Sequence, residues 1–148
     1  MTVSWFLVER RLRSASDEVG IGATLEELRA AENVLGITFP DAFRAFLTSC
    51  GWAAVGSREL YGLGKDVPPF LDLCAITISE RVEATPALPS DLIPLTNDGA
   101  GNLFCIRANV TRTPVVFWNH ELSGSQIPEH IADDYLEWLA ESIDCATS

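Results

Sequence analysis

The spacing of hydrophobic and polar positions predicts three helices in the first third of the chain. Residues 4–13 place hydrophobic side chains on one helical face and arginines mostly elsewhere. A second helix begins after Thr24, a favourable N-cap residue followed by Glu27 three positions later as in a capping box, and Gly36 ends it. A third helix has Pro40 at or near its first turn, and its hydrophobic face is formed by Phe43, Phe46, Leu47 and Cys50. We expect the second and third helices to form a hairpin or corner.

The pattern changes in the middle of the chain. Residues 14–22 are polar and contain glycines, which predicts a connection, and residues 52–65 combine short hydrophobic runs with glycines, which predicts short strands and turns. Residues 69–84 regain a helical spacing, although part of this segment also suits a strand. The residues that would align on the inward face of this helix are Leu71, Cys74, Ala75, Ile78 and Val82.

Three strands are predicted in the second half, at residues 92–96, 103–107 and 115–118. The first two are separated by Asn97-Asp98-Gly99-Ala100-Gly101-Asn102, whose residue types supply the positive φ angles that tight turns need. The third follows another turn-forming segment. Because each connection is short, we expect the three strands to form an antiparallel meander.

A last helix is predicted over residues 129–144, with acidic residues facing outward. Its inward-facing residues would be Ile131, Tyr135, Trp138 and Leu139. Helices, then a meander, then a helix is typical of an α+β fold, in which helices pack on one antiparallel β-sheet. The length, 148 residues, suits a single domain spanning residues 1–148.

The chain is strongly acidic, and its charge is unevenly distributed. It contains 21 acidic and 10 basic residues, which gives a formal net charge of −11. Residues 1–82 carry 11 acids and 8 bases, whereas residues 83–148 carry 10 acids and 2 bases. Such a surface repels nucleic acid and anionic membranes and attracts a basic protein. We therefore expect a protein partner, and neither nucleic acid nor a membrane.

Other features of the sequence predict a cytoplasmic protein. No stretch approaches the ~18 hydrophobic residues of a membrane span. The short hydrophobic run near the N-terminus precedes its arginines, which is the wrong order for a secretory signal. The cysteines are far apart and form no C-x-x-C pair, so we expect reduced and mostly buried thiols at Cys50, Cys74, Cys105 and Cys145.

The candidates for catalysis or metal binding are few. His120 follows a strand and could act as a base, but a single histidine in a loop is more often a surface residue without a catalytic role. Cys105 lies among hydrophobic residues of a predicted strand, which favours burial over nucleophilic reactivity. His130, Asp133 and Asp134 could hold a metal ion, but the sequence contains no second cluster at metal-ligand spacing. The favoured interpretation is therefore that they are ordinary polar residues on a helix surface. We predict no catalytic residue, no cofactor and no metal site, and hence a protein that is not an enzyme.

Two further binding functions are disfavoured by the same kind of argument. The glycine-containing segment 97–102 lacks the G-K-[ST] sequence of a phosphate-binding loop and is followed by a strand, so it favours a hairpin turn. Base stacking requires aromatic residues in a basic groove, and the chain beyond residue 82 has only two arginines. The aromatic residues considered for stacking are Trp52, Tyr61, Phe104 and Trp118.

The order of the motifs resembles the SUKH superfamily. Residues 32–47, ENVLGITFPDAFRAFL, resemble its opening pair of helices, and residues 60–63, LYGL, resemble its next strand. Residues 92–106, LIPLTNDGAGNLFCI, are similar to its hairpin, and residues 115–121, VVFWNHE, to the following strand. The core of the match covers about 24–121, and the helix predicted at about 129–144 takes the place of the family's last helix. Phe39 and Cys50-Gly51-Trp52 depart from the commoner residues, which preserves the fold and leaves the partner open.

The resemblance implies a compact α+β domain that binds protein. Many bacterial members resemble immunity proteins, which neutralise a cognate toxin, often a nuclease, of a polymorphic or contact-dependent system. Other relatives, including the fungal Smi/Knr group, are regulatory or scaffolding modules in cell-wall synthesis. An acidic chain suits the immunity role because a nuclease carries a basic surface. We expect an immunity protein for a toxin domain with a basic surface, with a regulatory or scaffold protein as the alternative.

The predicted partner-binding residues lie in or beside turns, where side chains are available for recognition. Aromatic residues would anchor the partner, and acidic residues would steer it. The alternative for the aromatic residues is that they belong to the core. The predicted anchors are Trp52, Tyr61 and Trp118, and the predicted steering residues are Glu59, Asp66, Asp98 and Glu121.

Overall fold

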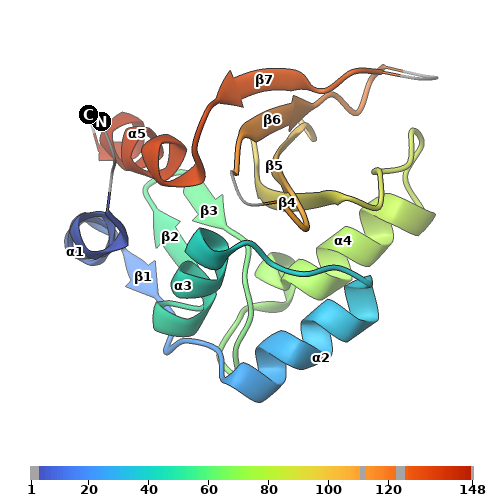
Figure 1. Ribbon diagram of the computed structural model, residues 1–148. Helices are drawn as coiled ribbons and strands as arrows, with labels where there is room; N and C mark the ends of the chain where they lie inside the picture. The colour runs from blue at the N-terminus through green and yellow to red at the C-terminus, as the bar shows by residue number, and fades with distance from the viewer. Residues whose placement is uncertain (1–3, 111–112, 123–125, 148) are drawn as a thin grey trace.

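The structure of the protein, a computed structural model, describes residues 4–110, 113–122 and 126–147. Figure 1 shows its helices and strands. The helices are α1 (Trp5–Ala15), α2 (Leu25–Leu35), α3 (Asp41–Ser49), α4 (Leu73–Val82) and α5 (Tyr135–Thr147), with a 3-10 turn, η1 (Pro69–Leu71), before α4. The strands are β1 (Glu18–Val19), β2 (Ala53–Val55), β3 (Arg58–Leu60), β4 (Leu92–Asn97), β5 (Leu103–Arg107), β6 (Val115–Trp118) and β7 (Glu129–Ala132).

The strands form two antiparallel sheets that meet at β3 and β4. One sheet has the order β1-β2-β3 and the other β4-β5-β6-β7. The backbone N–H of Tyr61 donates to the carbonyl oxygen of Leu95 at 3.0 Å, and the Thr96 hydroxyl donates to the carbonyl oxygen of Glu59 at 2.6 Å. In Figure 1, α2 and α4 lie side by side below the β4–β7 sheet, while α1 and α5 lie together near the β1–β3 sheet. The α+β class and the meander over residues 92–118 are confirmed.

The ends of α2 are formed by the predicted residues. The Thr24 hydroxyl accepts a hydrogen bond from the Glu27 N–H at 3.1 Å, and the Glu27 carboxylate accepts one from the Thr24 N–H at 2.9 Å, which completes the capping box. Gly36 ends the helix in the left-handed conformation, with φ 68°. The corner before α3 is fixed by Glu32, whose carboxylate accepts the Phe39 N–H at 2.8 Å. The expected helical corner is confirmed.

One hydrophobic core lies between the sheets and the helices, and aromatic rings fill its centre. Phe43 packs edge to face against Tyr135, with ring centroids 5.7 Å apart, and stacks on Phe46 at 6.1 Å. These three rings and Leu139 are buried, as the helical spacing predicted. The contact between Phe43 and Tyr135 joins α3 to α5 across most of the sequence.

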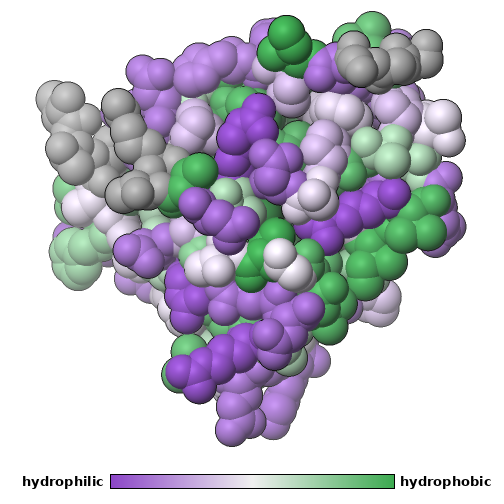
Figure 2. All heavy atoms as spheres, turned by 45° about the vertical axis from the view of Figure 1, so that its right-hand side comes forward, coloured by the Kyte–Doolittle hydropathy of each residue, from purple (hydrophilic) through white to green (hydrophobic). Residues whose placement is uncertain are grey.

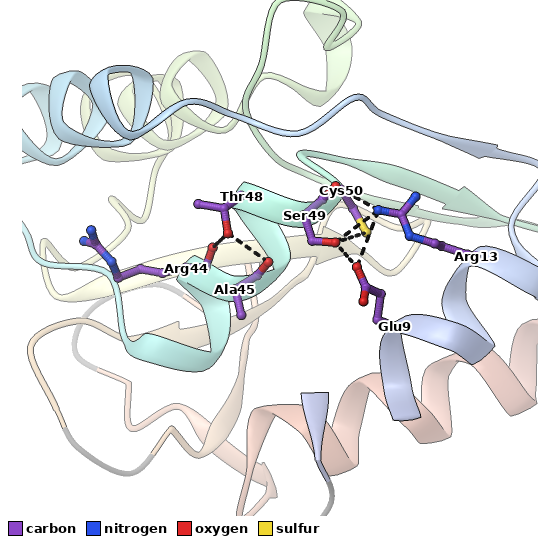
Figure 3. A network of polar contacts seen from close by, with 7 residues as sticks. All are labelled: Glu9, Arg13, Arg44, Ala45, Thr48, Ser49 and Cys50. Atoms are coloured by element: carbon purple, nitrogen blue, oxygen red, sulfur yellow. Dashed lines mark hydrogen bonds and ion pairs between the residues drawn. The ribbon is translucent and has the colours of Figure 1, made fainter. Parts of the chain in front are cut away.

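Helix α1 is held to the end of α3 by a polar network (Figure 3). The Arg13 guanidinium donates to the carbonyl oxygen of Ser49 at 2.9 Å and to its hydroxyl at 3.0 Å. The same hydroxyl donates to the Glu9 carboxylate, which also lies 3.5 Å from Arg13. Burial raises the pKa of the neighbouring Cys50 thiol, although Ser49 and Arg13 oppose the shift. The network provides hydrogen-bond partners for the C-terminal end of α3 and fixes the orientation of α1.

The prediction of a continuous helix over residues 129–144 is wrong at its start. Glu129–Ala132 is strand β7, paired with β6, and Ile131 is exposed instead of facing inward. The carboxylate of Asp134 accepts the N–H of Leu136 at 3.1 Å and so caps the helix that follows. Pairing with β7 provides hydrogen-bond partners for the backbone groups along one edge of β6. This stabilisation depends on the pairing of two separate segments, so the local periodicity does not indicate it.

The inward face predicted for residues 69–84 is wrong for Ala75, Ile78 and Val82, which are exposed, whereas Leu71 is buried and Cys74 is half-buried. Asp72 caps α4, with its carboxylate accepting the Cys74 N–H at 3.0 Å, so the α-helix begins later than predicted. The helix buries Leu73 and Thr77 and exposes Ile78 and Val82. Thr77 tolerates burial because its hydroxyl donates to the Leu73 carbonyl oxygen at 2.6 Å.

The short strands before α4 differ in detail from the prediction. The connection over residues 14–22 contains β1, which pairs with β2. Within residues 52–65 the strands are β2 and β3, so the predicted strand over 60–63 begins and ends too late. A two-residue strand such as β1 leaves no periodic signal, because it is defined only by its partner.

Candidate partner-binding site

A cleft of about 540 Å³ opens where β3, η1, the β4–β5 turn and the end of α5 meet. It brings together three of the predicted partner-binding residues from separate parts of the sequence. We call it the turn cleft, and the residues used in the argument below are Arg58, Glu59, Tyr61, Phe70, Asp98 and Phe104. The cleft therefore combines carboxylates, a phenol and aromatic rings at one place on the surface.

The β4–β5 turn forms the acidic wall of the turn cleft, and hydrogen bonds to its own side chains stabilise its conformation. The Asn97 side-chain oxygen accepts the Gly99 N–H at 2.6 Å, and the Asp98 carboxylate accepts the N–H groups of Ala100 at 2.8 Å and Asn102 at 3.1 Å. Gly99 adopts φ 93°, which the sequence had predicted for this turn. Burial acts to raise the pKa of Asp98, but these hydrogen bonds outweigh it and lower the pKa. Asp98 therefore carries its charge at a fixed position.

The floor of the turn cleft is formed by Tyr61. Its side chain is only 7% exposed, and burial raises its pKa to about 12. The charges of Glu80 and Glu59 act in the same direction, and a hydrogen bond with Asn97 opposes them. The phenol is thus neutral at physiological pH and can accept or donate a hydrogen bond.

Aromatic residues hold a cation, Arg58, in the lining of the cleft. The guanidinium of Arg58 lies 5.3 Å from the centre of the Phe104 ring and 6.0 Å from that of Trp138. At the rim, Phe70 is 64% exposed. The periodicity does not single out Phe70, because it predicts one helix over residues 69–84, although the preceding Pro68-Pro69 pair is a turn signal.

Trp52 and Asp66 lie outside the turn cleft and support the fold. Trp52 is 5% exposed, so the expectation of an exposed anchor is wrong and the alternative that it belongs to the core is confirmed. Its indole N–H donates to the Asp66 carboxylate at 3.1 Å, and the same carboxylate accepts the Ile21 N–H at 3.1 Å. Asp66 therefore has a structural task in joining the β1 region to the loop before η1.

Trp118 and Glu121 lie at the end of β6, also outside the cleft. Trp118 is 5% exposed and pairs with Leu103 across the sheet, so it too belongs to the core and is no exposed anchor. Glu121 is exposed, and its backbone N–H donates to the Asn119 side chain at 2.8 Å. Trp52 and Trp118 were misjudged for one reason: a residue at a strand end next to a turn can still point into the core.

The groups considered for catalysis or metal binding do not form an assembled centre. Cys105 is fully buried, and burial raises the pKa of its thiol strongly. His130 contacts Asp133 at 2.9 Å in an exposed pair. Within residues 4–110, 113–122 and 126–147, no group of three or more His, Cys, Asp or Glu side chains is arranged to hold a metal ion. The four cysteines are thiols and not disulfides.

The fold and the cleft define the class of protein: an α+β domain with an acidic and aromatic surface cleft. A family model described as SMI1-KNR4 cell-wall, SUKH_5, matches residues 7–144. The chain belongs to this family, which confirms the resemblance to the SUKH superfamily. None of the curated proteins compared with the chain matches it.

A solved structure supports the same fold. The chain is similar to a crystal structure of a protein from Pseudomonas syringae pv. tomato, with a TM-score of 0.65 and 20% identity. The likeness covers 90% of this chain and 93% of the other. At this identity the comparison concerns the fold alone. No helix in the described part of the chain is long and apolar enough to span a membrane.

Proposed function

We propose that this protein is an immunity protein, which binds a cognate toxin domain and blocks it, and that the toxin presents a basic surface to the turn cleft. The observation that carries the proposal is the cleft itself. It brings Glu59 and Tyr61, in and just after β3, together with Asp98 of a turn fixed by hydrogen bonds, and all three are residues that the sequence predicts for partner binding. A preformed site of this kind loses little conformational entropy on binding.

Ion pairs within the described residues involve neither acid of the turn cleft and only one of the three acids of the C-terminal helix α5. In α5, Asp144 is paired with Arg11 of α1. The ion pairs formed within the described residues do not include Glu59 or Asp98. The charges of these two residues therefore remain for a partner's lysines or arginines, and the net charge of −11 would accelerate the encounter with such a surface.

The exposed ring of Phe70 supplies the hydrophobic part of the proposed contact. Exposed aromatic residues within a polar surround are frequent centres of binding energy at protein interfaces. Phe70 thus takes the anchoring role that the sequence had assigned to the two buried tryptophans. The carboxylates would steer and orient the partner, while Phe70 would slow its dissociation.

The alternative is a regulatory or scaffolding protein with a different protein partner. The description of the matching family model, SMI1-KNR4 cell-wall, favours it. Proteins of this family are generally non-catalytic binding or immunity domains, and both functions use a protein-binding surface. They differ in the consequence of binding: neutralisation of a toxin in one case, assembly or control of other proteins in the other.

Co-expression with the C-terminal domain of the protein encoded by the neighbouring gene tests the proposal. We expect the wild-type chain to restore growth and the Glu59→Lys, Phe70→Ala double variant to restore it poorly, because charge and anchor are both lost. The matched control is Glu26→Lys, which reverses an exposed acid on α2 outside the cleft. No rescue by the wild type contradicts the immunity function. Full rescue by the double variant contradicts the turn cleft as the site.

A further inference from the structure

Arg58 is a cation in the turn cleft whose hydrogen-bonding capacity the fold does not use. In the described part of the chain four arginines are half-buried. The guanidiniums of Arg44 and Arg107 each contact a carboxylate, at 2.9 Å and 2.7 Å, and that of Arg81 donates to two backbone carbonyl oxygens. The guanidinium of Arg58 takes part in none of the hydrogen bonds or ion pairs formed within the described residues, although the chain contains 21 acids.

Aromatic rings fix the position of this cation instead. The Arg58 guanidinium lies 5.3 Å from the centre of the Phe104 ring and 6.0 Å from that of Trp138. A contact of this kind is electrostatic and supplies no acceptor for the N–H groups of the guanidinium. These N–H groups form a planar fork that matches the two oxygens of a carboxylate. Arg58 is therefore a positioned donor for an anion that the fold itself does not provide.

The charged residues that line the turn cleft comprise one cation and two anions. They are Arg58, Glu59 and Asp98, and the ion pairs formed within the described residues join none of them. A partner that fills the cleft removes water from all three charges. Because a charge buried without a counterpart is costly, each of the three then needs an opposite charge from the partner. The complement of this cleft is one anion and two cations.

The groove between α2 and α4 lacks such a pattern. It measures about 290 Å³, and the charged residues among those that line it are Glu27 and Asp72. Both carboxylates cap helices, since Glu27 accepts the Thr24 N–H at 2.9 Å and Asp72 accepts the Cys74 N–H at 3.0 Å. Figure 2 brings this side of the molecule forward and shows hydrophobic and hydrophilic residues mixed on it. Among the described residues no cation lines this groove, so a cation next to two acids distinguishes the turn cleft.

We infer that the partner presents a carboxylate to Arg58, together with the basic residues that pair with Glu59 and Asp98. This assignment rests on the proposed function, because the carboxylate belongs to the partner. A carboxylate fits better than a phosphate, whose second negative charge would lie close to the two acids of the cleft. The contact surface of the partner is thus basic overall but not uniformly so. Arg58 thereby determines specificity, since it repels a surface that carries only lysines and arginines.

Isothermal titration calorimetry of the full chain with the C-terminal domain of the protein encoded by the neighbouring gene tests this pairing. We expect Arg58→Met to raise Kd at least about tenfold, because the carboxylate would be buried without a charged donor. Arg58→Lys retains the charge but not the planar fork, so its Kd should lie between those of the wild type and Arg58→Met. The matched control is Arg29→Met, which removes an exposed arginine outside the cleft and should change Kd less than about twofold. Circular dichroism and urea unfolding verify the fold of each variant.

A uniformly basic partner surface gives the opposite sign. Loss of Arg58 would then relieve a repulsion, so Arg58→Met would bind as tightly as the wild type or more tightly, which overturns the inference. An increase in Kd that falls short of about tenfold also overturns it, because a lost bond to a neutral acceptor is sufficient to explain such a change. So does an Arg58→Lys variant that binds as weakly as Arg58→Met, which assigns the loss to packing.

Failure of the proposed function gives a different result. A wild-type chain that does not bind the domain overturns the proposed function, and the pairing of Arg58 with it. A wild-type chain that binds, with an Arg58→Met variant that binds equally well, overturns the pairing alone and leaves the turn cleft as the binding site.

Discussion

Removal of the Asp66 carboxylate should destabilise the protein, although the residue is exposed and lies in a loop. The sequence had assigned Asp66 to partner steering. In the structure its two oxygens accept hydrogen bonds from the buried Trp52 indole and from the Ile21 backbone, both at 3.1 Å. Asp66→Ala would leave the indole N–H without this acceptor in a pocket where Trp52 is 5% exposed.

The size of the effect follows from the two lost hydrogen bonds. An unsatisfied buried donor costs about 1–3 kcal/mol, and solvent access to Asp66 places the expected loss at about 1–2 kcal/mol. For a chain of this length that loss lowers Tm by roughly 2–8 °C. Trp52→Phe removes the donor itself, so Asp66→Ala should cost less in that background than in the wild type. The difference between the two costs measures the coupling of the pair.

Urea unfolding of the four proteins of this double-mutant cycle, followed by circular dichroism, provides the measurement. Glu59→Ala is a suitable control, because no hydrogen bond to its carboxylate is among those of the described residues. The reasoning is refuted if Asp66→Ala is as stable as the wild type. It is also refuted if the loss is the same with tryptophan and with phenylalanine at position 52.

Three further predictions concern the core and the turn cleft. Phe43→Ala should cost about 3–5 kcal/mol in urea unfolding, whereas Phe6→Ala, at an exposed site, should change stability by less than about 0.5 kcal/mol. The lowered pKa of Asp98 stabilises the fold above the pKa of the unfolded chain, so the advantage of the wild type over Asp98→Asn should shrink below about pH 4. Burial raises the pKa of Tyr61 to about 12, so stability should fall as pH rises from 10 to 12, and Tyr61→Phe should reduce this loss in alkaline unfolding curves.

Local chemistry explains why some elements could be predicted from the sequence. The capping box of α2 involves residues only three positions apart, and Gly36 ends the helix through its own backbone preference. The β4–β5 turn likewise depends on side chains that bond to amides within the same six residues. These interactions are encoded in short segments, so the sequence pattern is sufficient to locate them.

The errors occur where distant partners decide the outcome. Strand β7 exists because β6 offers it a paired edge, and the face that α4 buries is set by the contact of Arg81 with Leu35 and Ser90. Trp52 and Trp118 point inward because the core lies on that side of their strands. Side chains alternate between the two faces of a strand, but in strands this short the alternation does not show which face is buried. Glu59 and Asp98 are exposed, as expected, because charged side chains beside turns seldom enter a core.

Asp98 shows why a structural role and a binding role can coincide in the turn cleft. A carboxylate that accepts hydrogen bonds from Ala100 and Asn102 keeps its full negative charge, and the same bonds lower its pKa. The interactions that shape the turn thus also ensure that it is charged. Asp66 differs, because its hydrogen bonds serve the core and lie away from the cleft. Reversing all the predicted steering acids together would therefore confuse folding with recognition, whereas Glu59→Lys changes the charge of the cleft without removing a hydrogen bond that holds the turn.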